Sequence, residues 1–239
     1  MNMKIGVFQD LHANLPALKK AIEICRINDC EKIFHVGDLI GIGPYPKECL
    51  ELSLSIKEME FIMGNHDYLY PFGIPDTMSA EEKKHQEWTH EQIGNSYKTS
   101  VRKWPFIKEI ELSGQRKIIL QHYGIDKKTN WFKDHIAVPD ESDLDRLFDG
   151  NNANIIFYGH NHMASDITGN CRYVNLGSAG CFTKAEVRIG ILKISETALN
   201  LEKLSVPYDD NGFMEEFEIR QVPAREFIKK HFISRNQEL

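Results

Sequence analysis

Short apolar runs alternate with amphipathic segments through the first quarter of the chain. Apolar side chains cluster at residues 4–9, 32–36 and 60–63, and these runs predict three short buried strands. Between them, residues 15–29 place apolar side chains on one helical face, and residues 48–55 predict a second, shorter helix. Because strands and helices alternate, this order predicts a parallel-type sheet with helices on its faces.

The rest of the chain mixes helical and strand-like patterns. Residues 68–75 are aromatic and contain proline, which predicts a loop, and residues 80–103 are mostly helical with a break near a Gly-Asn pair. A hairpin is predicted where residues 107–112 and 117–121 flank a Ser-Gly pair. The remaining elements are a short helix at 141–148, strands at 154–158, 171–175, 187–194, 198–205 and 217–222, and an amphipathic helix at 224–234.

The composition is that of an ordinary globular protein. Of the 239 residues, 41% are hydrophobic and 27% are charged, a balance too apolar for disorder and too polar for a membrane protein. No apolar run approaches the ~18 residues of a membrane-spanning helix. We therefore expect one α/β domain over residues 1–239, with a small helical insertion at about 76–104.

The net charge and the number of cysteines limit the classes of binding partner and the cellular compartment that we expect. The net charge of −6 argues against binding of long nucleic acid, and no lipidation signal favours a membrane role. The five cysteines, an odd number without a CxxC spacing, argue against a disulfide framework and against a cysteine-based zinc site. This usage predicts a cytoplasmic protein, and the sequence leaves its oligomeric state open.

Side chains that are able to bind metals follow five of the predicted strands. They are Asp10, His12, Asp38, Asn65, His66, Asp67, His122, His160 and His162. Because the carboxyl ends of parallel strands in an α/β sheet form one crevice, residues distant in sequence meet there. Any one of these residues alone is as easily a turn former or a helix cap, so the prediction rests on the whole set.

The chemistry of this set suits a pair of transition-metal ions. Imidazole nitrogens combined with carboxylate and amide oxygens favour zinc, manganese, iron, cobalt or nickel. Two cations ~3.5–4 Å apart need a shared anion, and Asp38, alone in a glycine-rich turn, is the natural bridge. Two metals that share a hydroxide are suited to in-line attack on phosphorus, so these residues predict a phosphoester hydrolase.

The same residues fall in ordered blocks that resemble the calcineurin-like metallophosphoesterase superfamily. The blocks are D-L-H at 10–12, G-D at 37–38, G-N-H-D at 64–67, His122, and G-H-N-H at 159–162. The later N-L-G-S-A-G at 175–180 is similar to a segment of the small bacterial and archaeal phosphodiesterases. Residues 37–46 resemble the branch described as diadenosine-tetraphosphatase-like.

This resemblance implies a fold and a role for each residue. The implied fold is a four-layer α/β/β/α sandwich with two mixed sheets. The implied ligands are Asp10, His12 and His162 for the first metal, Asp38 as the bridge, and Asn65, His122 and His160 for the second metal. His66 would be the catalytic histidine that stabilises the transition state or protonates the leaving oxygen, and Asp67 would orient it or be a surface charge.

Substrate choice must come from side chains outside the metal ligands. Aromatic residues beside lysines are able to stack a base and hold a phosphate chain, and the alternative is that they pack the added helices. The candidates are Tyr68, Tyr70, Phe72, Tyr123, Lys127, Lys128, Trp131, Phe132 and Lys133. We expect the substrate to be a small phosphodiester or nucleotide, such as a diadenosine polyphosphate or a cyclic nucleotide.

Other functions are compatible with the same fold. A non-catalytic binding scaffold of this fold usually lacks the catalytic histidine or several ligands, whereas this chain has all of them. A phosphomonoesterase or protein phosphatase is another alternative, although the arginine-containing extension of the protein phosphatase signature is absent after Asp38. A nuclease of the same superfamily is disfavoured by the net negative charge.

Overall fold

The structure, a computed structural model, describes residues 3–233 of the chain. Within this range the strands form two larger sheets and a small ribbon. The first sheet has the order β12-β11-β1-β2-β3 and contains β1 Met3–Phe8, β2 Lys32–Val36, β3 Met59–Ile62, β11 Glu186–Ile194 and β12 Leu199–Pro207. The second has the order β4-β5-β8-β10-β9 and contains β4 Ile107–Glu111, β5 Lys117–Gln121, β8 Ile155–Phe157, β9 Ser165–Thr168 and β10 Arg172–Asn175. The ribbon pairs β6 Ile125–Asp126 with β7 Trp131–Phe132.

The helices connect the strands and cover the outer faces of the sheets. They are α1 Leu15–Ile27, α2 Pro46–Leu54, α3 Asn65–Phe72, α4 Ala80–Ile93, α5 Lys98–Val101, α6 Glu141–Leu147, α7 Phe213–Ile219 and α8 Arg225–Phe232, with a 3₁₀ turn at Ser113–Gln115. The first of them, α1, begins as its sequence predicts, because the Asn14 side chain accepts a hydrogen bond from the backbone N–H of Ala17 and a proline occupies the first turn.

Both sheets combine parallel and antiparallel pairs. In the first sheet, β1, β2 and β3 are parallel, and β11 and β12 continue the sheet in antiparallel pairing. In the second, β5, β8 and β10 are parallel, with β4 and β9 antiparallel at the two edges. The expectation of two mixed sheets is confirmed. The predicted site residues follow the carboxyl ends of five of the parallel strands.

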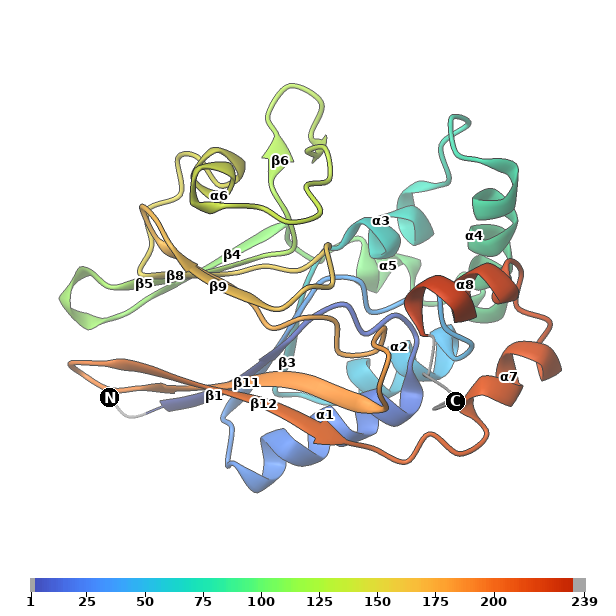
Figure 1. The fold of residues 1–239 in the computed structure, drawn as a ribbon, viewed down its shortest axis with the longest axis horizontal. Coiled ribbons are helices and arrows are strands. Elements are labelled where there is room, and N and C mark those ends of the chain that lie inside the picture. The colour runs from blue at the N-terminus through green and yellow to red at the C-terminus, as the bar shows by residue number, and fades with distance from the viewer. Residues whose placement is uncertain (1–2, 234–239) are drawn as a thin grey trace.

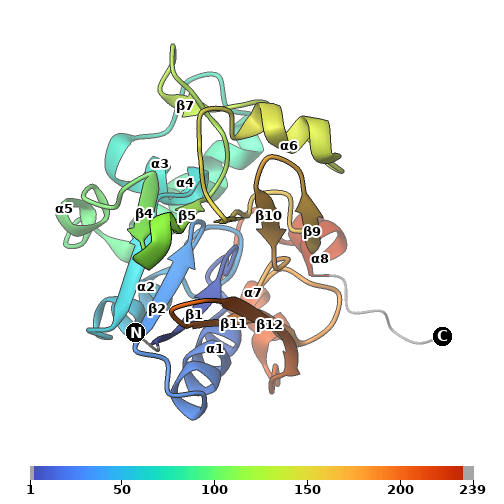
Figure 2. The same ribbon diagram turned by 90° about the vertical axis from the view of Figure 1, so that its left-hand side faces the viewer.

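The two sheets stack face to face between outer helices, as Figure 1 and Figure 2 show. Buried side chains from both sheets fill the seam between them, among them Val7 and Phe34 from one sheet and Leu120 and Phe157 from the other. A second apolar cluster joins α1 and α2 to the far face of the first sheet, and a third joins α6 to the far face of the second. This is the four-layer α/β/β/α sandwich that the resemblance implied.

The aromatic segment at 68–75 was expected to be a loop, and this expectation is wrong over most of its length. Residues Asn65–Phe72 form the helix α3, which begins after Gly64 and ends at Gly73. Pro71 lies in the last turn, where its missing N–H removes only one helical hydrogen bond. The buried side chain of Asp67 accepts the Gly64 N–H and stabilises the first turn, a tertiary feature that proline content does not reveal.

The segment at 217–222 was expected to be a strand, and the structure corrects this as well. Residues Phe213–Ile219 form the helix α7, because Phe213 and Phe217 stand four residues apart and both are buried in one apolar cluster. The following helix, α8, ends at Phe232 within the described residues, and Ser234, the expected end, lies outside them. The short strand β9 and the ribbon were not predicted.

Candidate metal centre

The predicted ligands meet at one end of the two sheets. They follow β1, β2, β3, β5 and β8, at the carboxyl ends of strands that run parallel within each sheet, and Asn65 is the first residue of α3. The almost fully buried ones are Asp10, His12, Asp38 and His122, and the half-buried ones are Asn65, His160 and His162. Because three loops come from the first sheet and two from the second, both sheets must be stacked before the site exists.

Asp10, His12 and His162 form the first group of donor atoms. The Nε2 atoms of His12 and His162 are 2.9 Å apart. The Oδ1 atom of Asp10 lies 3.9 Å from Nε2 of His12 and 3.8 Å from Nε2 of His162. Two imidazole ligands at right angles on one transition-metal ion lie about 3 Å apart, since each bond is about 2.0–2.1 Å long. The spacing of the first group therefore fits one cation.

Asn65, His122 and His160 form the second group, and Asp38 lies between the two groups. The Oδ1 atom of Asn65 is 3.2 Å from Nε2 of His122 and 2.9 Å from Nδ1 of His160. One carboxylate oxygen of Asp38, Oδ2, is 3.2 Å from Nε2 of His122 and 3.8 Å from Nε2 of His12. Asp38 thus stands where a carboxylate shared by two cations would stand.

Burial keeps three of the imidazoles neutral. It lowers the pKa of His160 to about 3, reinforced by the nearby charge of His122, and lowers the pKa of His162 to about 4. Burial and the neighbouring His162 also hold the pKa of His12 well below its ordinary value. Because neutral imidazoles offer a free lone pair at pH 7, their protonation state suits metal ligands.

The protons on His122 and Asp10 are the ones that a divalent cation would replace. The Nδ1 atom of His122 donates to the Val36 carbonyl at 2.8 Å, so its Nε2 atom faces the second group, an arrangement common to metal-binding histidines. Burial opposes its charge, but Asp38 and Asp10 raise the pKa of His122 to about 9. Burial raises the pKa of Asp10 to about 7. In donor chemistry, spacing and charge, the seven side chains fit two transition-metal ions.

Five of the seven side chains stand on backbone in the left-handed region. The φ values are 51° for Asp10, 50° for His12, 60° for Asp38, 75° for His160 and 57° for His162. Residues other than glycine rarely adopt this conformation, and it costs about 1–3 kcal/mol per residue. Strain of this kind gathers at functional sites, where the surrounding structure enforces it.

Asp67 holds the loop that carries Asp38. Its carboxylate is fully buried and accepts four backbone N–H bonds of 2.7–3.2 Å. The donors are Asp38, Leu39, Ile40 and Gly64. Since both carboxylate oxygens are engaged with the backbone, the expectation that Asp67 orients the catalytic histidine or lies at the surface is corrected. It is a positioning residue for the loop after β2.

His66 faces the first group from the start of α3. Its ring meets that of His12 edge-on with the centroids 5.1 Å apart, and its backbone N–H donates to Oδ1 of Asp38 at 2.9 Å. The hydrogen bond expected from Asp67 is made by Gln86 of α4, whose side-chain amide lies 3.1 Å from Nδ1 of His66. Sequence reasoning missed Gln86, because no local motif distinguishes it within a charged helix.

Tyr123 was expected to project towards the substrate, and the structure corrects this. Its ring is fully buried and lies against that of His160, with the centroids 4.4 Å apart. Its hydroxyl accepts the backbone N–H of Ile136 at 2.9 Å. Tyr123 therefore packs against His160, a predicted ligand, from within the core.

The other expected substrate residues lie beyond the second group. The ring of Tyr68 stacks on that of Phe72 at 4.3 Å and meets that of Trp131 edge-on at 4.9 Å, so these aromatics largely pack against one another. Lys127 and Lys128 are exposed between β6 and β7 and line a surface hollow. Among the described residues, the walls of this hollow include none of the predicted metal ligands.

A cavity of about 350 Å³ opens beside His66, between α4 and α8. Its walls include Ile42, His66, Gln86, Phe227, Ile228 and Phe232, with Glu81 and Glu82 from the start of α4. The ring of Phe232 also meets that of His162 edge-on, with the centroids 5.9 Å apart. From the sequence, this tail was predicted only to form an amphipathic helix. The apolar side of that helix was the available sign that it packs against another part of the molecule.

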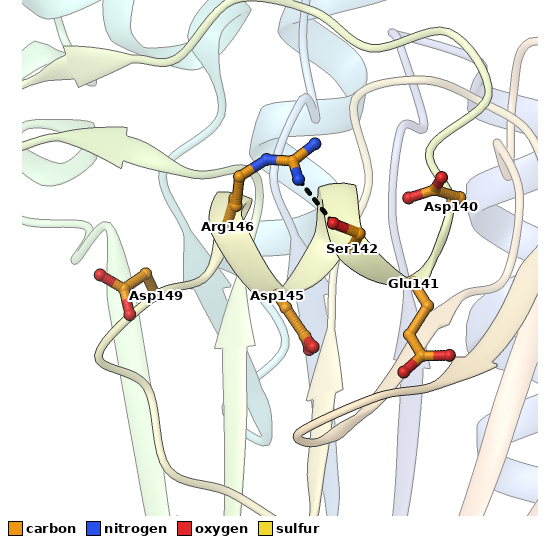
Figure 3. A pocket seen from close by; sticks show the side chains of 6 residues that line it. All are labelled: Asp140, Glu141, Ser142, Asp145, Arg146 and Asp149. Atoms are coloured by element: carbon orange, nitrogen blue, oxygen red, sulfur yellow. Dashed lines mark hydrogen bonds between the residues drawn. The ribbon is translucent and has the colours of Figure 1, made fainter.

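A larger hollow of about 660 Å³ lies on α6, in the outer layer over the second sheet (Figure 3). Its walls are Asp140, Glu141, Ser142, Asp145, Arg146 and Asp149. Arg146 donates to Ser142, and Asp145 accepts hydrogen bonds from Tyr173 and Asn170, so these side chains hold the outer layer together. The surplus of carboxylates disfavours an anionic substrate here.

Comparison with known proteins gives a consistent set of relatives. The calcineurin-like phosphoesterase superfamily domain matches residues 3–197. The uncharacterized protein MJ0912 of Methanocaldococcus jannaschii is 30% identical over 164 residues, which are 66% of this chain and 62% of that protein. The phosphodiesterase MJ0936 of the same organism is 33% identical over 86 residues, which are 36% of this chain and 42% of that protein. The matches therefore span less than two thirds of either relative's length.

A solved structure shares the fold over almost its whole length. The crystal structure of a hypothetical protein from Pyrococcus horikoshii OT3, PH1004, has a TM-score of 0.78 at 20% identity and covers 97% of this chain and 98% of its own. At this identity the likeness concerns the fold alone. Among residues 3–233, no helix combines the length and the apolar character that crossing a membrane requires.

Proposed function

The chain belongs to the calcineurin-like phosphoesterase superfamily, and on that basis we propose that it is a phosphodiesterase that depends on two divalent transition-metal ions. The observation that carries the proposal is the position of the Asp38 carboxylate between two groups of nitrogen and oxygen donors. Such a shared carboxylate is the feature by which a protein holds two cations close together. The proposed substrate is a small phosphodiester or nucleotide.

The ligand roles follow the two groups of donor atoms. The first metal would be held by Asp10, His12 and His162, the second by Asn65, His122 and His160, and Asp38 would be shared. The four imidazoles favour manganese, iron, cobalt, nickel or zinc over magnesium, which prefers oxygen ligands. When bound, the metals supply Lewis-acid charge to the phosphoryl oxygens and a nucleophile at neutral pH for in-line attack.

His66 is the proposed donor of a proton to the leaving oxygen. Because the side-chain amide of Gln86 lies against Nδ1, Nε2 is the nitrogen of His66 that remains for the substrate. The proton donor is the imidazolium form, in which both ring nitrogens carry a proton, and the amide oxygen of Gln86 would then accept the proton on Nδ1. An imidazole is the side chain best suited to give up a proton near neutral pH. In this proposal Gln86 orients the ring of His66, and the hydrogen bond from the His66 backbone N–H to Asp38 sets the distance between proton donor and bridging carboxylate.

The cavity between α4 and α8 is the proposed place of the leaving group. It begins at His66 and is walled by Phe227 and Phe232, so it suits a base or another flat apolar group. Glu81 and Glu82 stand in the same wall and disfavour a polyphosphate chain. These features support a small diester, such as a cyclic nucleotide, over a diadenosine polyphosphate.

A panel of phosphoesters on metal-depleted and reloaded protein tests this function. Treatment with a chelator should abolish hydrolysis of bis(p-nitrophenyl) phosphate, and Mn²⁺, Co²⁺, Ni²⁺ or Fe²⁺ should restore it better than Mg²⁺. The diester should be hydrolysed with a higher kcat/KM than p-nitrophenyl phosphate. Full activity in the presence of the chelator would exclude the metal centre, and a preference for the monoester would exclude the phosphodiesterase assignment.

The H66A variant separates proton transfer from metal binding. It should bind both metals and lose about 10²–10⁴-fold in kcat, the usual contribution of a general acid. Its matched control is H90A, because His90 stands on α4 and contacts Tyr70, outside the metal centre. Unchanged kcat in H66A at full metal content would overturn the role of His66.

We also infer that residues 1–239 act as one domain in the cytoplasm. The helices α4 and α5, which occupy the expected insertion, pack on the same apolar cluster as α1 and the first sheet. Among residues 3–233 the five cysteines form no disulfide. Measurement of the protein in fractionated cells tests the location.

A further inference from the structure

Cys181 stands beside the first group of donor atoms and has no part in the roles assigned above. Its Sγ atom and one ring nitrogen each of His12 and His162 all lie within 4.8 Å of one another. Its side chain is 6% exposed. We propose that the Cys181 thiolate is a further ligand of the first metal ion, an inference that rests on the metal centre of the proposed function.

The segment that ends in Cys181 is fastened to both loops that carry the first group. The backbone N–H of Ser178 donates to the His162 carbonyl, and the backbone N–H of Gly180 donates to the Asp10 carbonyl, both at 3.1 Å. The Ser178 hydroxyl adds a bond of 2.6 Å to the Asp10 carbonyl and accepts the N–H of Cys181 at 2.7 Å. The position of the thiol is therefore set by the ligand loops themselves.

A glycine directly before Cys181 allows this close approach. A Cβ atom on Gly180 would collide with the carbonyl oxygen of Leu11, in the loop between the ligands Asp10 and His12. The Gly180 carbonyl in turn accepts a bond of 2.9 Å from the Asn14 side chain. The close backbone contact at Gly180 therefore places Cys181 next to the loop that carries Asp10 and His12.

The distances suit a shared cation. Bonds from zinc to sulfur and to imidazole nitrogen are about 2.3 Å and about 2.0–2.1 Å long, so donors on opposite sides of one ion are about 4.4 Å apart. Donor atoms of Cys181, His12 and His162 within 4.8 Å need only a small side-chain rotation to share one ion. On binding, the S–H proton passes to solvent and a sulfur lone pair forms the bond to the cation.

A sulfur ligand would make the two metal positions chemically different. Thiolate is a soft ligand that favours zinc, cobalt and iron over manganese and magnesium. The second group offers Asn65, His122 and His160, all with nitrogen or oxygen donors. The first position should therefore select zinc, cobalt or iron, while the second accepts manganese as readily.

Cys181 is also a member of a buried apolar cluster, which supplies the competing explanation. That cluster contains Ile42, Phe213 and Phe217. A thiol that only filled space there would remain protonated and would leave the spectrum of a bound metal unchanged. The two explanations therefore differ in a spectroscopic property and can be separated without measuring activity.

Cobalt titration of the full chain is the direct test. Metal-depleted protein is titrated anaerobically with Co²⁺, whose visible bands report binding and whose near-ultraviolet thiolate charge-transfer band reports a sulfur ligand. Wild-type protein should show the charge-transfer band. The intensity of this band should saturate when one of the two equivalents of Co²⁺ has bound. C181S should show the visible bands of bound Co²⁺ and lack the charge-transfer band. C181A should give the same result, and it replaces C181S if serine disturbs folding.

The matched control is C171S, because Cys171 is 5% exposed and lies in the cluster under α6. C171S should keep the charge-transfer band. A wild-type protein that binds Co²⁺ without this band, or a C181A variant that keeps it, would overturn the sulfur ligand while leaving the proposed metal centre intact. A wild-type protein that binds no Co²⁺ at all would overturn both.

Metal affinities give an independent readout. C181A should lose at least about tenfold in affinity for Zn²⁺ or Co²⁺ at the first position, since removal of even an indirect partner of a metal ligand costs about 10–100-fold. Its affinity for Mn²⁺ should change less, because manganese gains little from sulfur. Equal losses for all three ions would contradict a thiolate ligand and indicate general damage to the site.

Discussion

At the scale of single residues, the site depends on strained backbone more than on any one contact. Five proposed ligands adopt left-handed φ values, among them Asp10 and Asp38, and each carries a conformational cost. Hydrogen bonds between the loops enforce this geometry, such as those from the N–H groups of Asp10 and His12 to the carbonyls of Gly37 and Asp38. The fold therefore holds the ligands in position before any cation arrives.

Asp67 should matter for stability as well as for metal binding. D67N replaces a carboxylate that accepts four backbone N–H bonds by an amide whose NH₂ group faces donors. We expect the free energy of unfolding of metal-depleted protein to fall by about 2–4 kcal/mol, measured by urea denaturation. The control is D76N, because Asp76 is fully exposed. Equal stability of D67N and wild type would show that these bonds contribute nothing.

Metal affinity should rise with pH. Burial raises the pKa of Asp10 to about 7, and the carboxylates of Asp38 and Asp10 raise the pKa of His122 to about 9 against the effect of burial. Below these values protons compete with the cation, so the affinity should increase from below pH 7 and level off above about pH 9. Competition with a chelator at constant ionic strength measures this, and an affinity that is flat across the window would contradict the assignment.

At the scale of elements, the sequence predicted the strands and their functional ends better than the short helices. Apolar runs located β1, β2, β5 and β8, and the structure brings the proposed ligands after them together, because a strand end fixes where its next side chains lie. The segments α3 and α7 were misassigned, since an eight-residue and a seven-residue helix owe their form to burial against distant residues. The roles of Gln86 and Cys181 depend on tertiary contacts, which no local pattern reports, and the amphipathic pattern of α8 did not reveal which surface its apolar side faces.

The loop after β2 should tolerate no side chain at Gly37. This residue has φ of 86°, and a Cβ atom would collide with the ring of the proposed ligand His122. G114A is the matched control, because Gly114 has φ of 71° but nothing lies within 4 Å of its Cβ position. Both variants carry the left-handed cost of about 1–2 kcal/mol, but only G37A should also lose the second metal, measured by metal content after dialysis. Two bound metals in G37A would contradict this account of the loop.

At the scale of the whole molecule, the site exists only where two sheets are held together. The first sheet supplies the loops with Asp10, Asp38 and Asn65, and the second supplies those with His122 and His160. The apolar seam between the sheets provides most of the cohesion, and polar contacts at their edges add to it. One such contact joins β9 and β10 of the second sheet to β12 of the first.

The edge contact centres on Asp166 and gives a pH-dependent stability. Its carboxylate accepts two bonds of 2.8 Å from Arg172 and one of 2.9 Å from Lys203, and these bonds lower its pKa from 3.8 to about 2. Because the folded-state pKa is depressed, the stabilisation is complete above pH 3.8 and is lost as the pH falls towards 2. We expect D166N to lower the free energy of unfolding by at most about 1 kcal/mol at neutral pH, since the group is partly exposed. Urea denaturation should show that the difference in unfolding free energy between wild type and D166N becomes smaller at low pH. A difference that increases at low pH would contradict this role of Asp166.

The most direct test of the central claim is anomalous diffraction from crystals of the Co²⁺-loaded protein, recorded at the cobalt absorption edge. We expect two peaks about 3.5–4 Å apart that share the Asp38 carboxylate. One should be bonded by Asp10, His12 and His162, and the other by Asn65, His122 and His160. A single peak, or two peaks that do not share Asp38, would contradict a two-metal centre built from these seven side chains.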